Sequence, residues 1–256
     1  MPPRAGGMAR VMADVALPHV LAADRDRSRG DGYAISKRIL DITIALLTLA
    51  ILSPLLLVIA LAIKLASPGP VIYAQRRLRG RRVRTDDGPA WTIEPFTLYK
   101  FRTMVDGADQ TTHREYMHAY LAGDEEKLTA LRPGRKAGES YRPANDPRVT
   151  RIGAVLRKYS LDEVPQLWNV VKGQMSLVGP RPPVPYEIEK YQDHHLKRLA
   201  CRPGITGWAQ VRGRAGIGFE EMVRLDMEYI GRRSILFDLK VLLVTVPVVL
   251  LTKGAD

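Results

Sequence analysis

Residues 42 to 63 read ITIALLTLAILSPLLLVIALAI, an apolar run without an ionisable side chain. One straight helix of this length would reach about 33 Å, enough to cross a hydrocarbon core about 30 Å thick. The simplest interpretation is therefore one transmembrane helix. Ser53-Pro54 lies near the midpoint, and a proline there removes a backbone donor and clashes with the carbonyl of Ala50. We expect the Ser53 hydroxyl to compensate for part of that loss.

Basic residues flank the apolar run on both sides. Lys37 and Arg38 precede it, Lys64 follows it directly, and an arginine-rich segment lies at 76–84. Basic residues near membrane segments favour the cytoplasmic side, so both ends of the run are predicted to lie on the same side. This pattern favours a re-entrant helix, broken at the Ser-Pro pair, over a helix that spans the bilayer, although kinked spanning helices exist.

The rest of the sequence predicts a mixed α/β, helix-rich fold. Short strands are expected at 71–73 and 96–99, joined by a Gly- and Arg-rich loop that turns at 86–88. Helical patterns follow at 105–131, 148–158, 162–171, 187–199, 219–229 and 235–251, with a loop at 132–144. The last helix is charged enough to favour an interfacial or core position over a spanning one.

Three regions follow from these patterns. We expect a flexible tail at 1–32, a re-entrant membrane helix at 33–66, and a compact domain at 67–256 that ends in the interfacial helix. The net charge of +12 suits anionic partners such as phosphorylated substrates, acidic lipids or nucleic acid. The single cysteine, Cys201, excludes an internal disulfide and a thiolate-rich zinc site. The histidines show no metal-binding spacing, and no GxxxxGK[ST] phosphate loop is present.

The best catalytic candidates are Asp162 and Glu163, in the segment Ser160-Leu161-Asp162-Glu163. The same Ser-x-x-Glu pattern is also that of a capping box, in which Ser160 and Glu163 would only cover free amides at a helix start. Nearby cations favour the functional interpretation, because two carboxylates with several cations suit a diphosphate and a divalent metal together. These cations are Lys100, Arg102, Arg157, Lys158 and Arg181.

Several long motifs occur in a recognisable order. They read YKFRTM from 99, DPRVTR from 146, SLDEVPQLWN from 160, MSLVGPRP from 175 and PGITGWAQV from 203. Together with Ser53-Pro54, they make residues 36–253 resemble the bacterial sugar transferases, the monotopic polyprenyl-phosphate phosphoglycosyltransferases that initiate exopolysaccharides and other surface glycans. The loop at 79–95 is longer than usual for that family.

The resemblance implies a catalytic domain on the cytoplasmic face of the inner membrane, anchored by a re-entrant helix. Asp162 and Glu163 would form the catalytic dyad and hold Mg²⁺. Asp162 would attack the β-phosphorus of a UDP-sugar, release UMP and pass the phosphosugar to a polyprenyl (undecaprenyl) phosphate. The substrate phosphates would be bound by four cations: Lys100, Arg102, Arg157 and Arg181.

Other interpretations stay open. A non-catalytic membrane adaptor of polysaccharide assembly could keep the fold, but it would have no need of a reactive dyad. The arginines at 76–84 could bind nucleic acid, yet their position beside the apolar run favours acidic lipid headgroups, and we expect no nucleic-acid partner. Homo-oligomers are possible. The sugar is glucose, galactose or an N-acetylated sugar, and the chain resembles a minimal form of the family.

Overall fold

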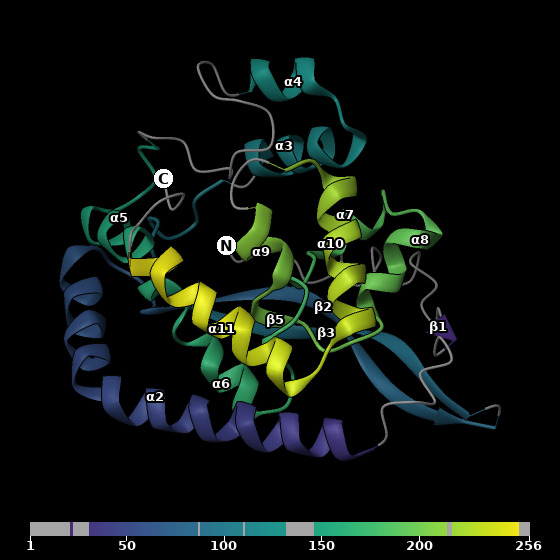
Figure 1. Cartoon of the computed structure of the whole chain (residues 1–256). Helices are drawn as coiled ribbons and strands as arrows, with labels where there is room; N and C mark the ends of the chain where they lie inside the picture. Colours follow the sequence, from purple (N-terminus) through teal and green to yellow (C-terminus); the bar gives the residue numbers. More distant parts are fainter. Residues whose placement is uncertain are drawn as a thin grey trace.

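The computed structural model describes residues 21–22, 31–86, 88–109, 111–131, 146–213 and 217–250. Within the predicted tail at 1–32, the strand β1 (Leu21–Ala22) pairs antiparallel with β3, described below. The loop expected at 132–144 lies outside the described residues. The described parts form a helix-rich α/β fold, as the sequence predicts (Figure 1).

The apolar run forms the middle of one long helix, α2 (Asp31–Ala66), which contains Pro54. Figure 1 shows two arms of this helix that meet at a bend. The Ser53 hydroxyl donates to the Ala50 carbonyl at 2.8 Å. The proline leaves that carbonyl without its usual helical donor, so the expected compensation by Ser53 is confirmed. Among the described helices, α2 is the one that is long and apolar enough to cross a membrane.

Both arms of α2 pack on the same globular domain. Ala45 of the first arm belongs to the main hydrophobic core, and Ile59 and Ile63 of the second arm pack with Phe101 and Leu156. The outer side of the helix remains apolar and exposed. Its exposed large side chains are Ile35, Ile39, Leu46, Leu47, Ile51, Leu55, Leu57, Val58, Leu61 and Leu65.

The two basic residues that precede the apolar run form contacts with other residues of the protein. Lys37 Nζ lies 2.9 Å from Asp238 Oδ2. Arg38 donates to the carbonyls of Val170 and Val171 at 2.6 and 2.9 Å, where a neighbouring helix ends. These two charges therefore fasten the first arm of α2 to the domain, a role that the flanking-charge argument did not foresee.

The segment expected to be a loop between two short strands is instead a long hairpin. β2 (Ile72–Thr85) pairs antiparallel along its whole length with β3 (Gly88–Phe101). The expected turn is confirmed by the pairing of Thr85 with Gly88, but the long loop is wrong. Gly80 was interpreted as a loop residue, but it lies within β2 and allows close packing. A Cβ at this position would lie 1.8 Å from the Leu199 carbonyl oxygen.

Short helices and one small parallel sheet complete the domain. The helices are α3 (Thr111–Ala122), α4 (Glu125–Ala130), α5 (Arg151–Lys158), η1 (Leu161–Glu163), α6 (Gln166–Val171), α7 (Pro185–Ile188), α8 (Asp193–Leu196), η2 (Lys197–Leu199), α9 (Trp208–Gly213), α10 (Phe219–Arg232) and α11 (Ile235–Leu250). The two parallel strands are β4 (Ser176–Val178) and β5 (Gly204–Thr206).

The region 187–199 departs from the expected continuous, exposed helix. It divides into short turns, and Glu187, His195 and Arg198 are buried. Arg198 Nη2 lies 2.6 Å from Asp226 Oδ2, and both side chains are almost fully enclosed. An ion pair between buried partners requires the arginine to face inward, which a pattern of exposed polar residues does not predict.

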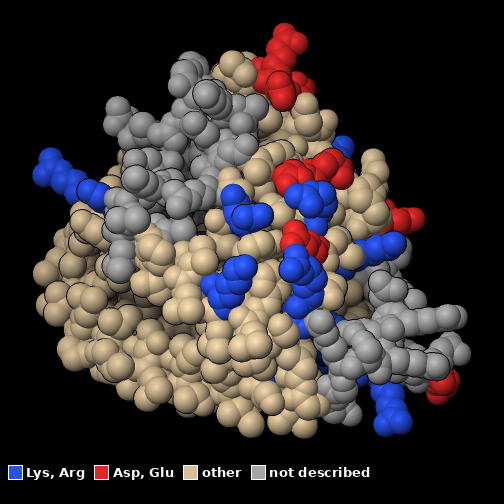
Figure 2. Space-filling view, in the orientation of Figure 1, with Lys and Arg blue, Asp and Glu red and all other residues tan. Residues whose placement is uncertain are grey.

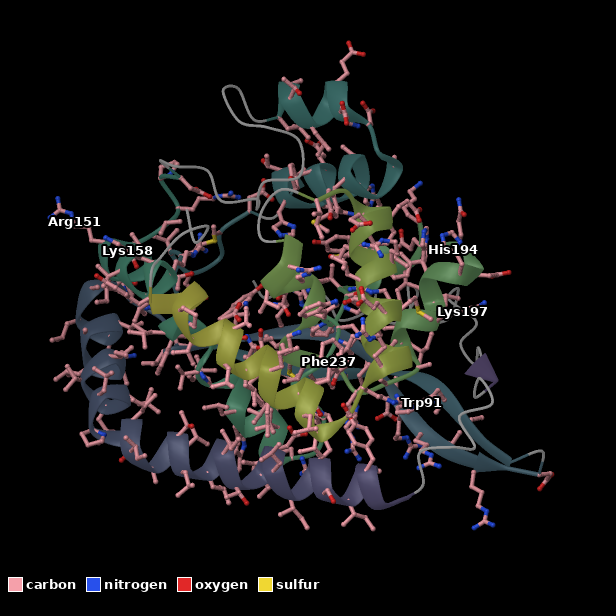
Figure 3. The ribbon with its side chains drawn as sticks, in the orientation of Figure 1. Trp91, Arg151, Lys158, His194, Lys197 and Phe237 are labelled. Carbon is pink, nitrogen blue, oxygen red and sulfur yellow. The ribbon has the colours of Figure 1, made fainter. Side chains whose placement is uncertain are left out.

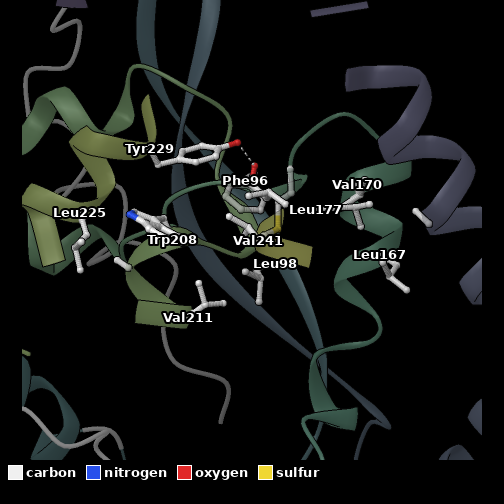
Figure 4. Close-up of a cluster of buried hydrophobic side chains, with 14 residues drawn as sticks. Phe96, Leu98, Leu167, Val170, Leu177, Trp208, Val211, Leu225, Tyr229 and Val241 are labelled. Atoms are coloured by element: carbon white, nitrogen blue, oxygen red, sulfur yellow. Dashed lines mark hydrogen bonds between the residues drawn. The ribbon is translucent and has the colours of Figure 1, made fainter. Parts of the chain in front are cut away.

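The main core lies between β3, α6, the small sheet and the C-terminal helices (Figure 4). Tyr229 is buried there, and its hydroxyl lies 2.7 Å from Asp238 Oδ1 and 3.0 Å from the Val178 carbonyl. Burial and the Asp238 carboxylate raise the pKa of Tyr229 well above its usual value, so the hydroxyl keeps its proton and donates. Asp238 therefore links α10, α11 and the first arm of α2.

Candidate functional site

The two candidate carboxylates lie on a strained turn between α5 and α6. Ser160 adopts the left-handed conformation with φ of 54° and ψ of 21°, and among the described residues it is the one non-glycine residue with positive φ. Its side chain makes no capping hydrogen bond, so the capping-box interpretation is wrong. Strain of this kind is stored at functional sites more often than elsewhere.

The two carboxylates of the turn have different surroundings. Asp162 is enclosed, with 5 % of its surface exposed, whereas Glu163 is partly exposed. Glu163 Oε1 lies 2.7 Å from Lys100 Nζ, at the end of β3. The structure thus brings together Lys100 and Glu163, which are far apart in the sequence.

The other three predicted substrate-binding cations have different positions. Arg157, in the last turn of α5, donates through Nε to the Thr103 hydroxyl at 2.9 Å. Arg102 is buried and donates to Ser67 and Pro68, so its guanidinium holds the segment that follows α2. Arg181 is exposed, and it forms no ion pair with any carboxylate that the structure describes. Substrate binding by these residues stays a prediction.

Arg77 is a cation of this region that the sequence analysis missed. It is buried on β2 and donates to the Pro182 carbonyl at 2.8 Å, in the segment that carries Arg181. Burial, and then repulsion by Arg181, lower the pKa of Arg77 to about 10, while attraction by Glu187 and, to a smaller extent, by Tyr186 and Glu163 opposes that shift. Arg77 and Arg181 therefore add positive potential near the dyad. The sequence analysis placed Arg77 in the arginine-rich segment at 76–84, and nothing in that pattern indicated that its side chain is buried.

The buried Asn169 holds α6, and with it the turn, against β3. Its side-chain oxygen accepts from the Tyr99 amide at 3.1 Å, and its side-chain nitrogen donates to the Thr97 carbonyl at 2.7 Å. A side-chain amide that accepts from a backbone N–H group of a strand and donates to a backbone carbonyl of the same strand makes the hydrogen bonds that a neighbouring strand would make. The motif that contains the dyad thus also contains the residue that positions it.

A second group of polar side chains lies near α8, where the structure brings His194 and His195 close to Glu220. His195 Nδ1 accepts from the Gln192 amide at 2.9 Å, so the proton of the neutral ring is on Nε2, which lies 2.8 Å from Glu220 Oε1. A metal would need the lone pair of Nε2. This hydrogen-bond pattern favours a structural role.

The family model described as "Bacterial sugar transferase" matches residues 32–252, which include α2, the hairpin, the dyad and α11. The chain belongs to the bacterial sugar transferase family. Its resemblance at the level of motifs is thereby confirmed, and the strained turn, Lys100 and Arg77 all lie within the matched region of this sugar transferase.

Individual relatives give the same result. "Galactosyl transferase CpsE" of Streptococcus agalactiae is 40 % identical over 87 % of this chain, and "Exopolysaccharide production protein ExoY" of Sinorhizobium fredii is 39 % identical over 86 %. "UDP-glucose:undecaprenyl-phosphate glucose-1-phosphate transferase" of Caulobacter vibrioides is 39 % identical over 86 %. The matched part spans 44, 88 and 72 % of these relatives, so this sugar transferase spans less than half the streptococcal protein.

Proposed function

We propose that this protein transfers a sugar-1-phosphate from a UDP-sugar to a polyprenyl phosphate, the first step of exopolysaccharide or other surface glycan synthesis. The observation that carries the proposal is the strained turn, which holds Asp162 and Glu163 beside Lys100. The name of the Caulobacter relative, a UDP-glucose:undecaprenyl-phosphate glucose-1-phosphate transferase, supports both the donor and the acceptor. We leave the sugar itself open among glucose, galactose and N-acetylated sugars.

The proposed reaction has two displacement steps. In the first, a carboxylate oxygen of Asp162 bonds to the β-phosphorus of the donor, the bond from that phosphorus to the bridging oxygen breaks, and UMP leaves with the electron pair. In the second, a phosphate oxygen of the carrier attacks the same phosphorus and the Asp162 carboxylate leaves. Covalent catalysis of this kind divides one difficult transfer into two easier ones.

The cations near the turn suit the charge that must be bound. Lys100, Arg157 and Arg181 would bind the donor diphosphate, and Arg77 would add to the positive potential behind them. Placed cations stabilise a transferring phosphoryl group because they compensate charge where it develops. Arg102 would act indirectly, because it holds Ser67 and Pro68 at the end of α2.

The residues of the turn also fit a divalent cation. Asp162 and Glu163 are adjacent oxygen donors, and carboxylate oxygens are the protein ligands that Mg²⁺ prefers. We propose that these two residues hold Mg²⁺, which when bound would neutralise part of the donor's diphosphate charge. Lys100 would then keep Glu163 oriented through their 2.7 Å contact.

We further propose a monotopic arrangement on the cytoplasmic face of the inner membrane. Both arms of α2 pack on one globular domain, through Ala45 in the first arm and through Ile63 in the second. A single domain lies on one side of a bilayer, so both ends of α2 would return to that side. The bend at Ser53-Pro54 would be the deepest point of the re-entrant helix.

Release of UMP tests the reaction. The purified full chain in detergent is incubated with Mg²⁺, a panel of UDP-sugars and undecaprenyl phosphate. Asp162→Asn is expected to abolish turnover without loss of thermal stability, whereas Asp193→Asn, which changes an exposed carboxylate on α8, leaves turnover unchanged. Full turnover by Asp162→Asn would refute the covalent role. Absence of turnover by the unchanged protein with every donor would favour the adaptor.

Cysteine labelling tests the membrane arrangement separately. In a Cys201→Ala background, Ser36→Cys and Ala74→Cys place single thiols near the two ends of α2. Sealed inverted vesicles are treated with a membrane-impermeant maleimide. Both positions are expected to react equally. If only one reacts before the vesicles are opened with detergent, the helix spans the bilayer.

A further inference from the structure

The outer face of α11 is apolar except for one lysine. Leu236, Leu243 and Val246 expose 80, 73 and 55 % of their surface. Lys240 lies four residues after Leu236 and three before Leu243, so it emerges from the same face of the helix. Figure 2 shows basic side chains at the edge of a broad uncharged surface that covers α2 and α11. An apolar helix face with a basic residue is typical of a helix at the depth of lipid headgroups.

A hollow of about 440 Å³ adjoins this face, between α9 and the start of α11. Two cations lie over the Trp208 ring, with the Arg212 guanidinium 4.9 Å and Lys240 Nζ 5.8 Å from the ring centre. Phe237, labelled near the centre of Figure 3, packs edge-on against the same ring at 5.0 Å. Aromatic and basic residues are both enriched where proteins contact the membrane interface.

The hollow carries an excess of positive charge. Arg232 also lines it and pairs at 2.8 Å with Glu228, the one carboxylate among the described residues that line the hollow. Within the described residues, neither Arg212 nor Lys240 forms an ion pair. Two like charges held over one ring repel each other, and a bound anion would relieve that repulsion.

Trp208 contributes a second observation. The residue is 7 % exposed, and its indole nitrogen is enclosed without an acceptor among the described residues. Figure 4 shows that nitrogen directed away from the centre of the hydrophobic cluster. An enclosed N–H group without an acceptor is unfavourable. Because the nitrogen itself is enclosed, an acceptor oxygen of a ligand would reach it only after the surrounding side chains shift.

We propose that this hollow binds the phosphate of an anionic phospholipid, whose acyl chains lie along the Leu236–Val246 strip. The proposal rests on the membrane association proposed above, but it uses no residue of the dyad turn. Arg212 and Lys240 bind the phosphate oxygens, Trp208 supplies an aromatic wall, and the strip explains why the anion belongs to a lipid. Acidic lipids would thereby fix the rotation of α11 at the surface, in addition to the anchor formed by α2.

Binding is measured on the full chain in detergent through the fluorescence of Trp208. Trp91→Phe and Trp168→Phe remove the other two tryptophans. The protein is titrated with dioctanoyl phosphatidylglycerol, with dioctanoyl phosphatidylcholine, and with inorganic phosphate. We expect saturable binding of phosphatidylglycerol, weaker binding of the zwitterionic lipid, and no response to phosphate at the same concentrations.

A pair of exposed charges provides the matched control. Arg212→Gln with Lys240→Gln is expected to weaken phosphatidylglycerol binding about 30-fold, from about 1 kcal/mol for each basic residue. Lys190→Gln with Lys197→Gln makes the same charge change on the α7–η2 side, where Figure 3 labels Lys197, and is expected to leave binding unchanged. Equal loss in both pairs, equal affinity for the two lipids, or an equal response to phosphate would overturn the lipid site. Because no sugar donor is present, the result is independent of the proposed transferase reaction.

Discussion

Lys100 Nζ lies 2.7 Å from Glu163 Oε1 and so joins the end of β3 to the turn that carries the dyad. Both side chains are partly exposed, at 22 and 27 %. Exposed ion pairs contribute at most about 1 kcal/mol to stability. The pair is therefore better explained by what it orients than by what it stabilises.

Lys100→Met is the first prediction. We expect turnover to fall about 100-fold, because the cation that we propose to bind the donor diphosphate is lost, while the thermal midpoint stays within a few degrees. Lys100→Arg should restore part of the activity. UMP release and thermal unfolding are measured on the same preparations, with Lys197→Met as the control. A large loss of stability with unchanged turnover would contradict the orienting role.

Ser160 provides a second prediction, because its φ of 54° is unfavourable for a residue with a side chain. Ser160→Gly should be neutral or stabilising, since glycine adopts this conformation without strain. Ser160→Val should destabilise the protein by about 1–2 kcal/mol and lower turnover, because a β-branched residue resists it. Equal stability of the two variants would show that the turn relaxes to another conformation.

The sequence predicts the local chemistry of this protein better than its long-range contacts. Helix α10 and the Ser53 bond to Ala50 both follow from patterns within one segment, whereas the contact of Glu163 with Lys100 joins two motifs that are far apart in the sequence. The long hairpin does not follow from a local pattern, because Gly80 is required by the Leu199 carbonyl, far away in the sequence. A glycine or arginine has several structural uses, and only its neighbours in space decide among them.

The site shows the same division. The dyad was predicted from a motif, yet that motif also predicted a capping box, and only the structure, in which the Ser160 side chain makes no capping hydrogen bond, excludes it. Arg102 and Arg77 have similar sequence contexts, but Arg102 holds Ser67 and Pro68, and Arg77 lies under the segment of Arg181. The presence of an arginine in the sequence does not indicate which groups its guanidinium contacts in the fold.

Gly153, in α5, leads to a third prediction. Replacing a helical glycine by alanine usually gains up to about 1 kcal/mol. Here a Cβ would lie 2.1 Å from the Thr103 carbonyl oxygen, so α5 would have to move away from the residue that Arg157 contacts. We expect Gly153→Ala to destabilise by about 1–3 kcal/mol and to lower turnover.

Gly231 in α10 is the control for this substitution. Nothing lies within 4 Å of the position that its Cβ would occupy. Gly231→Ala should therefore stabilise the protein by up to about 1 kcal/mol, as helix propensity alone predicts. Urea unfolding in detergent compares the two variants, and the same sign of change in both would contradict the packing argument.

His113 gives a prediction about pH. Burial, then repulsion by Arg181 and Arg77, lower its pKa to about 4. Since the folded state disfavours the proton, the unfolded chain takes it up first as the pH falls below about 6.5. Stability should therefore be complete above pH 6.5, decrease by about 3 kcal/mol between pH 6.5 and 4, and change no further from this group below pH 4. His113→Gln, measured by urea unfolding, should flatten this part of the profile, and an unchanged slope would contradict the assignment.

The last prediction concerns Asp238, which fastens α2 to α11. Its carboxylate is 1 % exposed and accepts from Tyr33 at 3.0 Å, Lys37 at 2.9 Å and Tyr229 at 2.7 Å. Asp238→Asn leaves Lys37 without its close partner, and breaking such a buried pair costs about 3–5 kcal/mol. Thermal unfolding in detergent should show this loss, whereas Glu221→Gln, at an exposed pair on α10, should show none.

The double variant of this pair separates charge from packing. Lys37→Met with Asp238→Leu removes both charges of this pair, so it should recover part of the stability lost in Asp238→Asn. Lys37 also lies 4.0 Å from the buried Asp41, so the remaining deficit would measure the loss of that contact together with the hydrogen bonds of Tyr33 and Tyr229. If the double variant is instead less stable than Asp238→Asn, these contacts together outweigh the cost of leaving Lys37 without Asp238.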